Sequence, residues 1–205
     1  MFKSILDAVM ERRARQLTEH VGSWLPSAGP VLDLGSGTGH LSAHLERELR
    51  LDVITADVSD IHVVGPRPVL IGDGALPFGD RTFSAALLLF MLAYPQDPAR
   101  VLAEAARVTR GPIILVQSLH SNRLGYAWLR VREFFWTVVA FHVSKLAGYV
   151  PRDARFSMNT RRFYTPQDLR RDVLAAGLRV RASKERQILP GSSLVVAGWV
   201  LDADV

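Results

Sequence analysis

The chain of 205 residues contains no cysteine. It therefore forms no disulfide bond, and it has neither thiolate ligands for zinc nor a cysteine nucleophile. A chain without cysteine suits a reducing compartment, and on this ground we expect a cytoplasmic location.

Long apolar runs are lacking as well. No stretch reaches the roughly 18 uncharged apolar residues that a membrane-spanning helix needs. The nearest approach is residues 134–144, FFWTVVAFHVS, which charged residues flank on both sides. The first twenty residues mix charged and apolar side chains at helical spacing and contain no signal-peptide block. We therefore expect a protein that does not span a membrane.

Acidic residues are scarce in the second half of the chain. Residues 103–205 hold 16 Lys and Arg against 8 Asp and Glu, whereas residues 1–102 hold 9 against 12. The basic residues of this half form either an ordinary solvated face of the protein or a surface that meets anionic lipid, nucleic acid or an acidic substrate.

The apolar residues that are present predict an α/β fold. With 48% hydrophobic and 22% charged residues, the chain suits one folded domain over residues 1–205. Near-continuous apolar runs alternate with amphipathic segments, which is typical of a doubly wound, Rossmann-like, mostly parallel seven-stranded sheet. The expected strands are 30–34, 51–56, 68–71, 84–90, 112–117, 178–183 and 194–201, and the expected helices are 1–25, 39–49, 98–108, 122–149 and 165–176.

The most informative segment is residues 31–39, VLDLGSGTG, where a buried strand ends in a glycine-rich turn that opens into a helix. Glycines at every second position let the backbone pass close to a ligand, and the free N–H groups of the helix favour an anionic group there. The spacing differs from the dinucleotide fingerprint G-x-G-x-x-G. Asp33, two residues before the first glycine, would crowd a pyrophosphate but suits an ammonium group. We therefore expect a zwitterionic ligand.

With these motifs the chain resembles the class I S-adenosylmethionine-dependent methyltransferases, in the branch that includes quinone-biosynthesis and other small-molecule enzymes. The resemblance covers about residues 25–118 and resumes at 163–180. Besides VLDLGSGTG it rests on ITADVSD, on IGDGALPF and on FYTPQDLRRDVLAAGL. It implies that S-adenosylmethionine is the cofactor and that methyl transfer is the activity.

The resemblance also assigns residues to the cofactor. Asp33 and the turn would hold its methionine end, and Asp57 would bind both ribose hydroxyls, as a carboxylate can. Asp73 would receive the adenine amino group. The full set of expected cofactor-binding residues is Asp33, Gly35, Ser36, Gly37, Gly39, Asp57, Val58, Asp73, Gly74, Ala75 and Phe90.

The chain departs from the family pattern in three places. Ala93 and Tyr94 stand where many members carry a histidine pair, and Ser84 stands where an aspartate often begins the fourth strand. The segment between Asp57 and Asp73 is short and contains Gly-Pro-Arg-Pro at 65–68, so we expect a loop in place of the usual helix.

Catalysis requires alignment above all, and a base only if the acceptor is not already nucleophilic. Tyr94, His120 and His142 are the candidates for such a base. No spacing of His, Asp and Glu suggests a metal site, and no G-x-S-x-G elbow suggests a serine hydrolase.

The acceptor should be chosen by residues 120–160, an aromatic-rich helical insertion. Its apolar residues cover most of a helix circumference, so we expect a helix buried on several sides as a lid over a small, apolar or aromatic acceptor. A second hypothesis is that this helix and the basic residues near it dock on a membrane surface. RNA as the acceptor and a non-catalytic cofactor-binding partner subunit are the alternatives.

Overall fold

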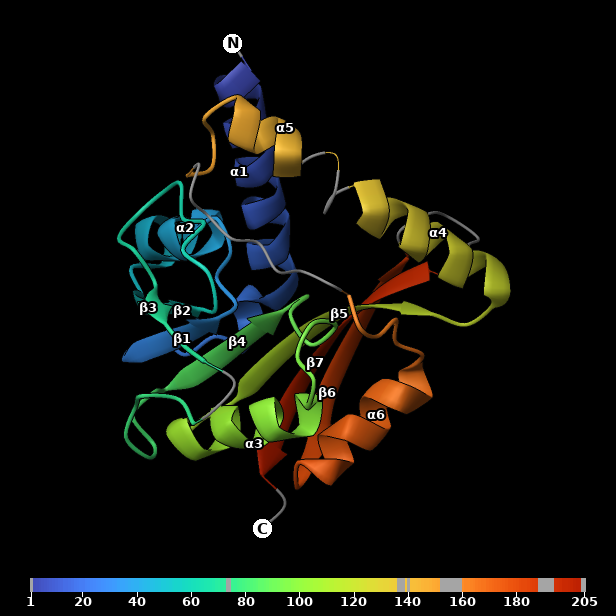
Figure 1. Cartoon of the computed structure of the whole chain (residues 1–205). Coiled ribbons are helices and arrows are strands. Elements are labelled where there is room, and N and C mark those ends of the chain that lie inside the picture. The colour runs from blue at the N-terminus through green and yellow to red at the C-terminus, as the bar shows by residue number, and fades with distance from the viewer. Residues whose placement is uncertain are drawn as a thin grey trace.

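Seven strands form one sheet in the order β3-β2-β1-β4-β5-β7-β6. The computed structural model describes residues 2–72, 75–135, 139, 141–151, 160–187 and 194–203 (Figure 1). β1 to β5 run parallel, while β7 lies antiparallel between β5 and β6. The strands are β1 (Pro30–Leu34), β2 (Asp52–Asp57), β3 (Val69–Leu70), β4 (Ala85–Leu89), β5 (Ile113–His120), β6 (Leu178–Gln187) and β7 (Leu194–Ala203). This is the doubly wound sheet that the apolar runs predict.

Helices cover both faces of the sheet (Figure 1). They are α1 (Phe2–Val21), continued by the 3-10 turn η1 (Gly22–Trp24), α2 (His40–Leu49), α3 (Pro98–Val108), α4 (Arg123–Phe134), α5 (Phe141–Leu146) and α6 (Pro166–Ala175). Thr165 is the N-cap of α6, because its hydroxyl accepts the amide hydrogen of Asp168 at 3.2 Å. Asp97 caps α3 in the same way, by accepting from the amide of Arg100 at 3.1 Å.

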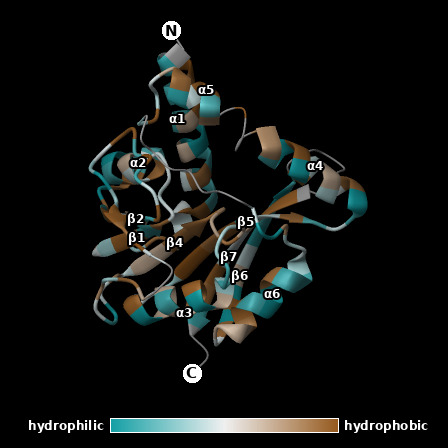
Figure 2. Ribbon diagram, in the orientation of Figure 1, coloured by the Kyte–Doolittle hydropathy of each residue, from teal (hydrophilic) through white to brown (hydrophobic). Residues whose placement is uncertain are grey.

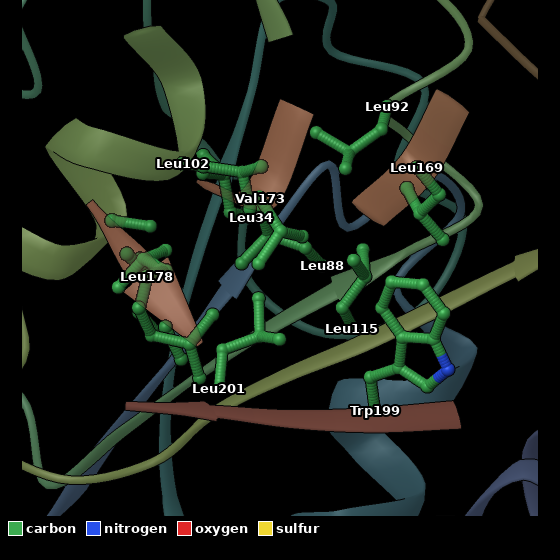
Figure 3. Close-up of a cluster of buried hydrophobic side chains, with 14 of the residues drawn as sticks. Leu34, Leu88, Leu92, Leu102, Leu115, Leu169, Val173, Leu178, Trp199 and Leu201 are labelled. Carbon is green, nitrogen blue, oxygen red and sulfur yellow. The ribbon is translucent and has the colours of Figure 1, made fainter. Parts of the chain in front are cut away.

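Alternate residues of the central strands face opposite helices, as the two-residue period of a strand requires. On one face Leu34, Leu88 and Leu115 pack with Leu102 of α3 and Leu169 of α6, and all five are fully or almost fully buried (Figure 3). The opposite face packs against α1 and α2; its buried residues are Val21, Val31, Leu45, Leu51, Val53, Ala85, Leu87, Ile114 and Val116. Burial on both faces explains why the strands read as continuous apolar runs.

The segment between β5 and α6 differs from its prediction. The sequence favours one helical stretch over 122–149, whereas the structure has two helices, α4 and α5, with π-helical geometry at Phe135 and Val139. The expected burial is also absent for several apolar side chains, and Leu124 and Leu146 are 81% and 85% exposed.

Within the described residues, no helix has the length and apolar character needed to cross a membrane.

Candidate functional site

The candidate site is the glycine turn that joins β1 to α2. Gly35, Gly37 and Gly39 all have positive φ angles, of 80°, 59° and 82°. A Cβ on Gly35 would lie 2.8 Å from the Cβ of Met91, and one on Gly39 would lie 2.3 Å from the backbone oxygen of Val64. A Cβ on Gly37 would meet nothing within 4 Å. Two of the glycines are thus required by neighbouring parts of the protein, and Gly37 leaves the space where a ligand can approach the backbone.

Asp57 at the end of β2 holds this turn. Its Oδ2 accepts a hydrogen bond from the amide of Gly37 at 2.8 Å, and its Oδ1 accepts one from the amide of Ser59 at 3.1 Å. Burial raises the pKa of Asp57, and these amide bonds oppose the rise. Each carboxylate oxygen has a second lone pair, so the side chain can still accept hydroxyl hydrogens. The next residue, Val58, is 65% exposed beside it.

Asp33 lies beneath the same turn, on β1. Its side chain is almost wholly buried and accepts a hydrogen bond from the hydroxyl of Ser42 at 2.5 Å. Burial raises the pKa of Asp33 to about 6; the Ser42 bond opposes this rise, and the negative charge of Asp57 adds to it. Two buried carboxylates whose ionised forms are destabilised favour a cation between or beside them. The site therefore fits a ligand with ammonium or sulfonium charge.

The loop after β2 is tied to the turn without a helix, as predicted. The Nδ1 of His62 lies 2.6 Å from the carbonyl oxygen of Pro66, which can only accept, so Nδ1 carries the proton. The Nε2 of His62 then accepts from the hydroxyl of Ser36 at 2.8 Å. The hydroxyl of Ser36, an expected cofactor ligand, is therefore already engaged. No local signal in the sequence pointed to His62, because its partner lies 26 residues away.

The expected adenine segment is described only in part, because Asp73 and Gly74 lie outside the described residues. Ala75 is exposed, and the segment after it is held by α3. The amide of Leu76 donates to Oε2 of Glu104 at 2.9 Å, and Arg107 donates to the carbonyl oxygens of Leu76 and Phe78 at 3.1 and 3.0 Å. Glu104 and Arg107 also pair with each other at 2.8 Å. We call this group the Glu104–Arg107 clamp.

Phe90 stands where β4 ends at the edge of the site. Its φ angle of 59° is unusual for a residue with a large side chain, and its amide donates to the carbonyl oxygen of Val116 at 2.7 Å. The guanidinium carbon of Arg13 lies 5.0 Å from the centre of its ring. Strained backbone of this kind clusters at ligand sites, so the geometry is compatible with the expected role of Phe90.

Tyr94, the first base candidate, donates its hydroxyl hydrogen to Oε1 of Glu133 at 2.8 Å. The hydroxyl of Thr160 donates to the same oxygen at 2.7 Å. Burial, followed by the negative charge of Glu133, raises the pKa of Tyr94 well above its usual value. The phenol therefore stays protonated at neutral pH, and its contact with Glu133 joins the chain after β4 to α4.

The other two candidates lie elsewhere. His120 packs edge-to-face on Tyr126, in the first turn of α4, with ring centres 5.4 Å apart. Glu133, the partner of Tyr94, lies seven residues further along α4, a separation of roughly 10 Å. The Nδ1 atom of His120 is buried and has no hydrogen-bond partner in the described part of the chain. His142 lies on α5. Tyr94 and His120 thus contact opposite ends of α4, and the catalytic role of each of the three candidates stays a prediction.

The helix after the turn begins with His40, where distant segments meet. His40 Nε2 lies 3.4 Å from Oδ1 of Asp7 on α1 and 3.2 Å from the hydroxyl of Tyr149, just after α5. Tyr149 and Val150 pack with Ile61 of the loop after β2. The chain after α5 therefore closes over the glycine-turn side of the sheet. Among the described residues, no group of His, Asp and Glu could hold a metal ion.

Comparison with known proteins agrees with this geometry. A family model described as a methyltransferase domain matches residues 6–183. A demethylmenaquinone methyltransferase from Renibacterium salmoninarum is 33% identical over 125 residues, which cover 57% of this chain and 52% of that protein. A ubiquinone/menaquinone biosynthesis C-methyltransferase from Desulfotalea psychrophila is 35% identical over 95 residues, which cover 42% of this chain and 39% of that protein. The chain spans about half the length of the curated relatives it matches.

Solved structures share the fold at low sequence identity. A SAM-dependent methyltransferase from Methanosarcina mazei superposes with a TM-score of 0.60 at 14% identity, covering 89% of this chain and 96% of that one. A geranyl diphosphate C-methyltransferase from Streptomyces coelicolor A3(2), solved with S-adenosyl-L-homocysteine, gives a TM-score of 0.61 at 12% identity, covering 93% and 79%. At these identities the similarity concerns the fold alone.

Proposed function

The chain belongs to the S-adenosylmethionine-dependent methyltransferases, since the methyltransferase-domain model matches most of its length, and from this membership we propose that it methylates a small, apolar or aromatic acceptor. One observation carries the cofactor site from which this proposal starts. The carboxylates of Asp33 and Asp57, at the ends of adjacent parallel strands, both adjoin a turn in which Gly37 leaves the backbone open to a ligand.

The residues of this site have complementary tasks toward the cofactor. Asp33 would balance the ammonium charge of the methionine end, and the first amides of α2 would receive its carboxylate. Asp57 would accept the hydrogens of the ribose hydroxyls while it keeps its bond to Gly37. Val58 and Ala75, both exposed, are available to the adenine. When bound, the cofactor supplies a methyl group that is electrophilic through its sulfonium.

The remaining task of the protein is to align the acceptor with that methyl group. Because the raised pKa of Tyr94 keeps its phenol protonated, we assign Tyr94 to positioning the acceptor rather than to proton abstraction. The acceptor would then bring its own nucleophile, as an electron-rich aromatic carbon or an ionised hydroxyl does. The relatives named as demethylmenaquinone and ubiquinone/menaquinone methyltransferases support an acceptor of the quinol class.

Release of S-adenosylhomocysteine tests this function. The purified chain is incubated with S-adenosylmethionine and, in parallel, with reduced isoprenoid quinones lacking the ring methyl, with simple phenols, and with transfer RNA. The proposal expects release with the quinols or phenols and none with RNA. Release with RNA alone would assign the chain to RNA methylation. Cofactor binding without release in any reaction or with cell extract would assign it to a non-catalytic binding role.

A further inference from the structure

Helix α4 has its polar and apolar sides reversed relative to an ordinary surface helix. The side that faces the protein carries Gly125 and Leu129, both buried, together with two charged residues. Arg132 donates to the hydroxyl of Ser118 on β5 at 3.3 Å, and Glu133 accepts from Tyr94 at 2.8 Å. A helix on a water-facing surface normally turns such charged residues outward.

The opposite side of α4 is apolar and exposed. Leu124, Val131 and Phe135 are 81%, 70% and 54% exposed, and their spacing of seven and four residues places them on one face of the helix. Phe134 beside them is 62% exposed. Trp128, at 38% exposure, completes what we call the outer face of α4. Figure 2 shows the mixed hydropathy of this helix at the edge of the molecule. Monomeric soluble proteins rarely present so many large apolar side chains together.

The outward-facing charge that α4 itself carries has one sign. Between residues 121 and 151 the sequence contains a single acid, Glu133, which faces inward as Arg132 does. The other charged residues in this range are all cations, Arg123 and Arg130 on α4 and Lys145 on α5. The guanidinium of Arg130 lies over Tyr126, 6.0 Å from the ring centre, and that of Arg132 over Trp128 at 5.4 Å. Apolar and aromatic side chains flanked by arginines are the composition of helices that lie in the headgroup region of a bilayer.

We propose that the outer face of α4 docks on the surface of an anionic phospholipid bilayer. The apolar side chains would enter the boundary between headgroups and acyl chains, while Arg123 and Arg130 would meet lipid phosphates. A second copy of the chain is a poor occupant, because a symmetric dimer over this face brings Arg123 and Arg130 of both copies together, and α4 carries no outward-facing acid to pair with them. Docking goes beyond the proposed methyl transfer and does not depend on it.

Vesicle co-sedimentation tests the docking without any cofactor. Vesicles of phosphatidylcholine alone are compared with vesicles that also contain phosphatidylglycerol, using the wild-type chain, the double variant Val131→Ser/Phe134→Ser and the control Leu174→Ser. Leu174 is 59% exposed on α6, so the control removes a similar apolar surface elsewhere. Wild type and the control should bind the anionic vesicles, and the double variant should bind them at least about tenfold more weakly.

Salt and charge variants complete the test. Arg123→Gln/Arg130→Gln should weaken binding to anionic vesicles roughly tenfold, and 0.5 M salt, about three times the physiological strength, should do the same. The double substitution Arg12→Gln/Arg15→Gln on α1 is the matched control and should bind as wild type does. Equal binding by all variants, or no binding to anionic vesicles, overturns the proposal. The proposal is also overturned if light scattering shows that the wild-type chain is a dimer and that the variant Val131→Ser/Phe134→Ser is a monomer. Calorimetry with S-adenosylmethionine on the same samples reports separately on the cofactor site.

Discussion

The carboxylate of Asp57 and the amide of Gly37 are joined by a hydrogen bond of 2.8 Å, which links the end of β2 to the turn after β1. The same side chain that is assigned to the ribose therefore also fixes the backbone on which the methionine end would rest. The contacts to the two ends of the cofactor are therefore coupled. Loss of the Asp57 carboxylate should weaken the binding of the ribose and of the methionine end alike.

Asp57→Ala should weaken S-adenosylmethionine binding by roughly tenfold or more, given about 1.5–3 kcal/mol for hydrogen bonds to a charged group. Isothermal titration calorimetry measures this directly. Asp52→Asn, an exposed carboxylate at the other end of the same strand, is the matched control and should bind normally. Unchanged affinity in Asp57→Ala would mean that the ribose lies elsewhere.

Cofactor affinity should depend on pH through Asp33, whose pKa is raised to about 6. A cationic ligand favours the ionised carboxylate, so affinity should be constant above about pH 7 and fall as the pH drops below 6, by up to about tenfold per pH unit. Titrations between pH 5 and 8 measure the slope. Asp33→Asn should bind weakly at every pH and lose the slope, whereas Asp52→Asn should keep it. A wild-type affinity that is flat across this range contradicts the assignment.

The same raised pKa makes a prediction about stability without ligand. The folded state retains the proton of Asp33 up to about pH 6, whereas the unfolded chain releases it near pH 4, so the free energy of unfolding falls as the pH rises through this interval. Asp33→Asn should therefore stabilise the unliganded protein at pH 8, by on the order of 1–3 kcal/mol, and give no gain at pH 4. Thermal melts at the two pH values measure it. An equal gain at both would assign the effect to packing.

Alanine substitutions should separate the roles of the glycines. Gly177, after α6, has a φ angle of 70° and open space, so Gly177→Ala reports the cost of the backbone conformation alone, about 1–2 kcal/mol. Gly37→Ala should destabilise the protein by the same amount and also prevent cofactor binding. Gly39→Ala should cost more than about 3 kcal/mol, because its Cβ meets the backbone oxygen of Val64. Chemical denaturation measures the stability of each variant, and calorimetry measures its cofactor affinity. Normal cofactor affinity in Gly37→Ala would show that the cofactor does not bind at this turn.

The Glu104–Arg107 clamp should order the segment expected to bind adenine. Arg107→Met leaves the carbonyl oxygens of Leu76 and Phe78 without this donor, so amide hydrogen exchange across residues 76–83 should accelerate and cofactor affinity should fall several-fold. Arg100→Met on the same helix is the control. Unchanged exchange in Arg107→Met would show that the segment is held by its own packing.

The sequence predicted the sheet well, because strands buried on both faces must be apolar throughout. β1 and α3 have the expected bounds, and β5 extends three residues beyond its prediction. That extension pairs with β7, as Leu119 does with Val195, and a partner so distant in the chain leaves no local signal. The N-cap of α6, by contrast, is a local interaction, because the hydroxyl of Thr165 binds an amide only three residues further along the chain.

The site was predictable only where it depends on the strand ends. Asp33 and Asp57 follow from the motifs, whereas His62 and Arg107 act through partners 26 and 31 residues away. The exposure of the apolar side chains on α4 could not be predicted from the sequence, because hydropathy reveals which side chains are apolar but not which way a helix faces. The inward contact of Glu133 with Tyr94 decides that orientation, and it is a tertiary contact.

The antiparallel position of β7 has a consequence for biosynthesis. β6 reaches the sheet through β7 alone among the described strands, although it is translated before β7. While residues 194–203 are still within the ribosome, β5 has an open edge and β6 has no neighbour to pair with. The two strands must therefore be added together, late, after the parallel half has been able to assemble. Any nascent chain that stalls between them leaves the backbone N–H and C=O groups along that edge of β5 unpaired and open to pairing with another chain.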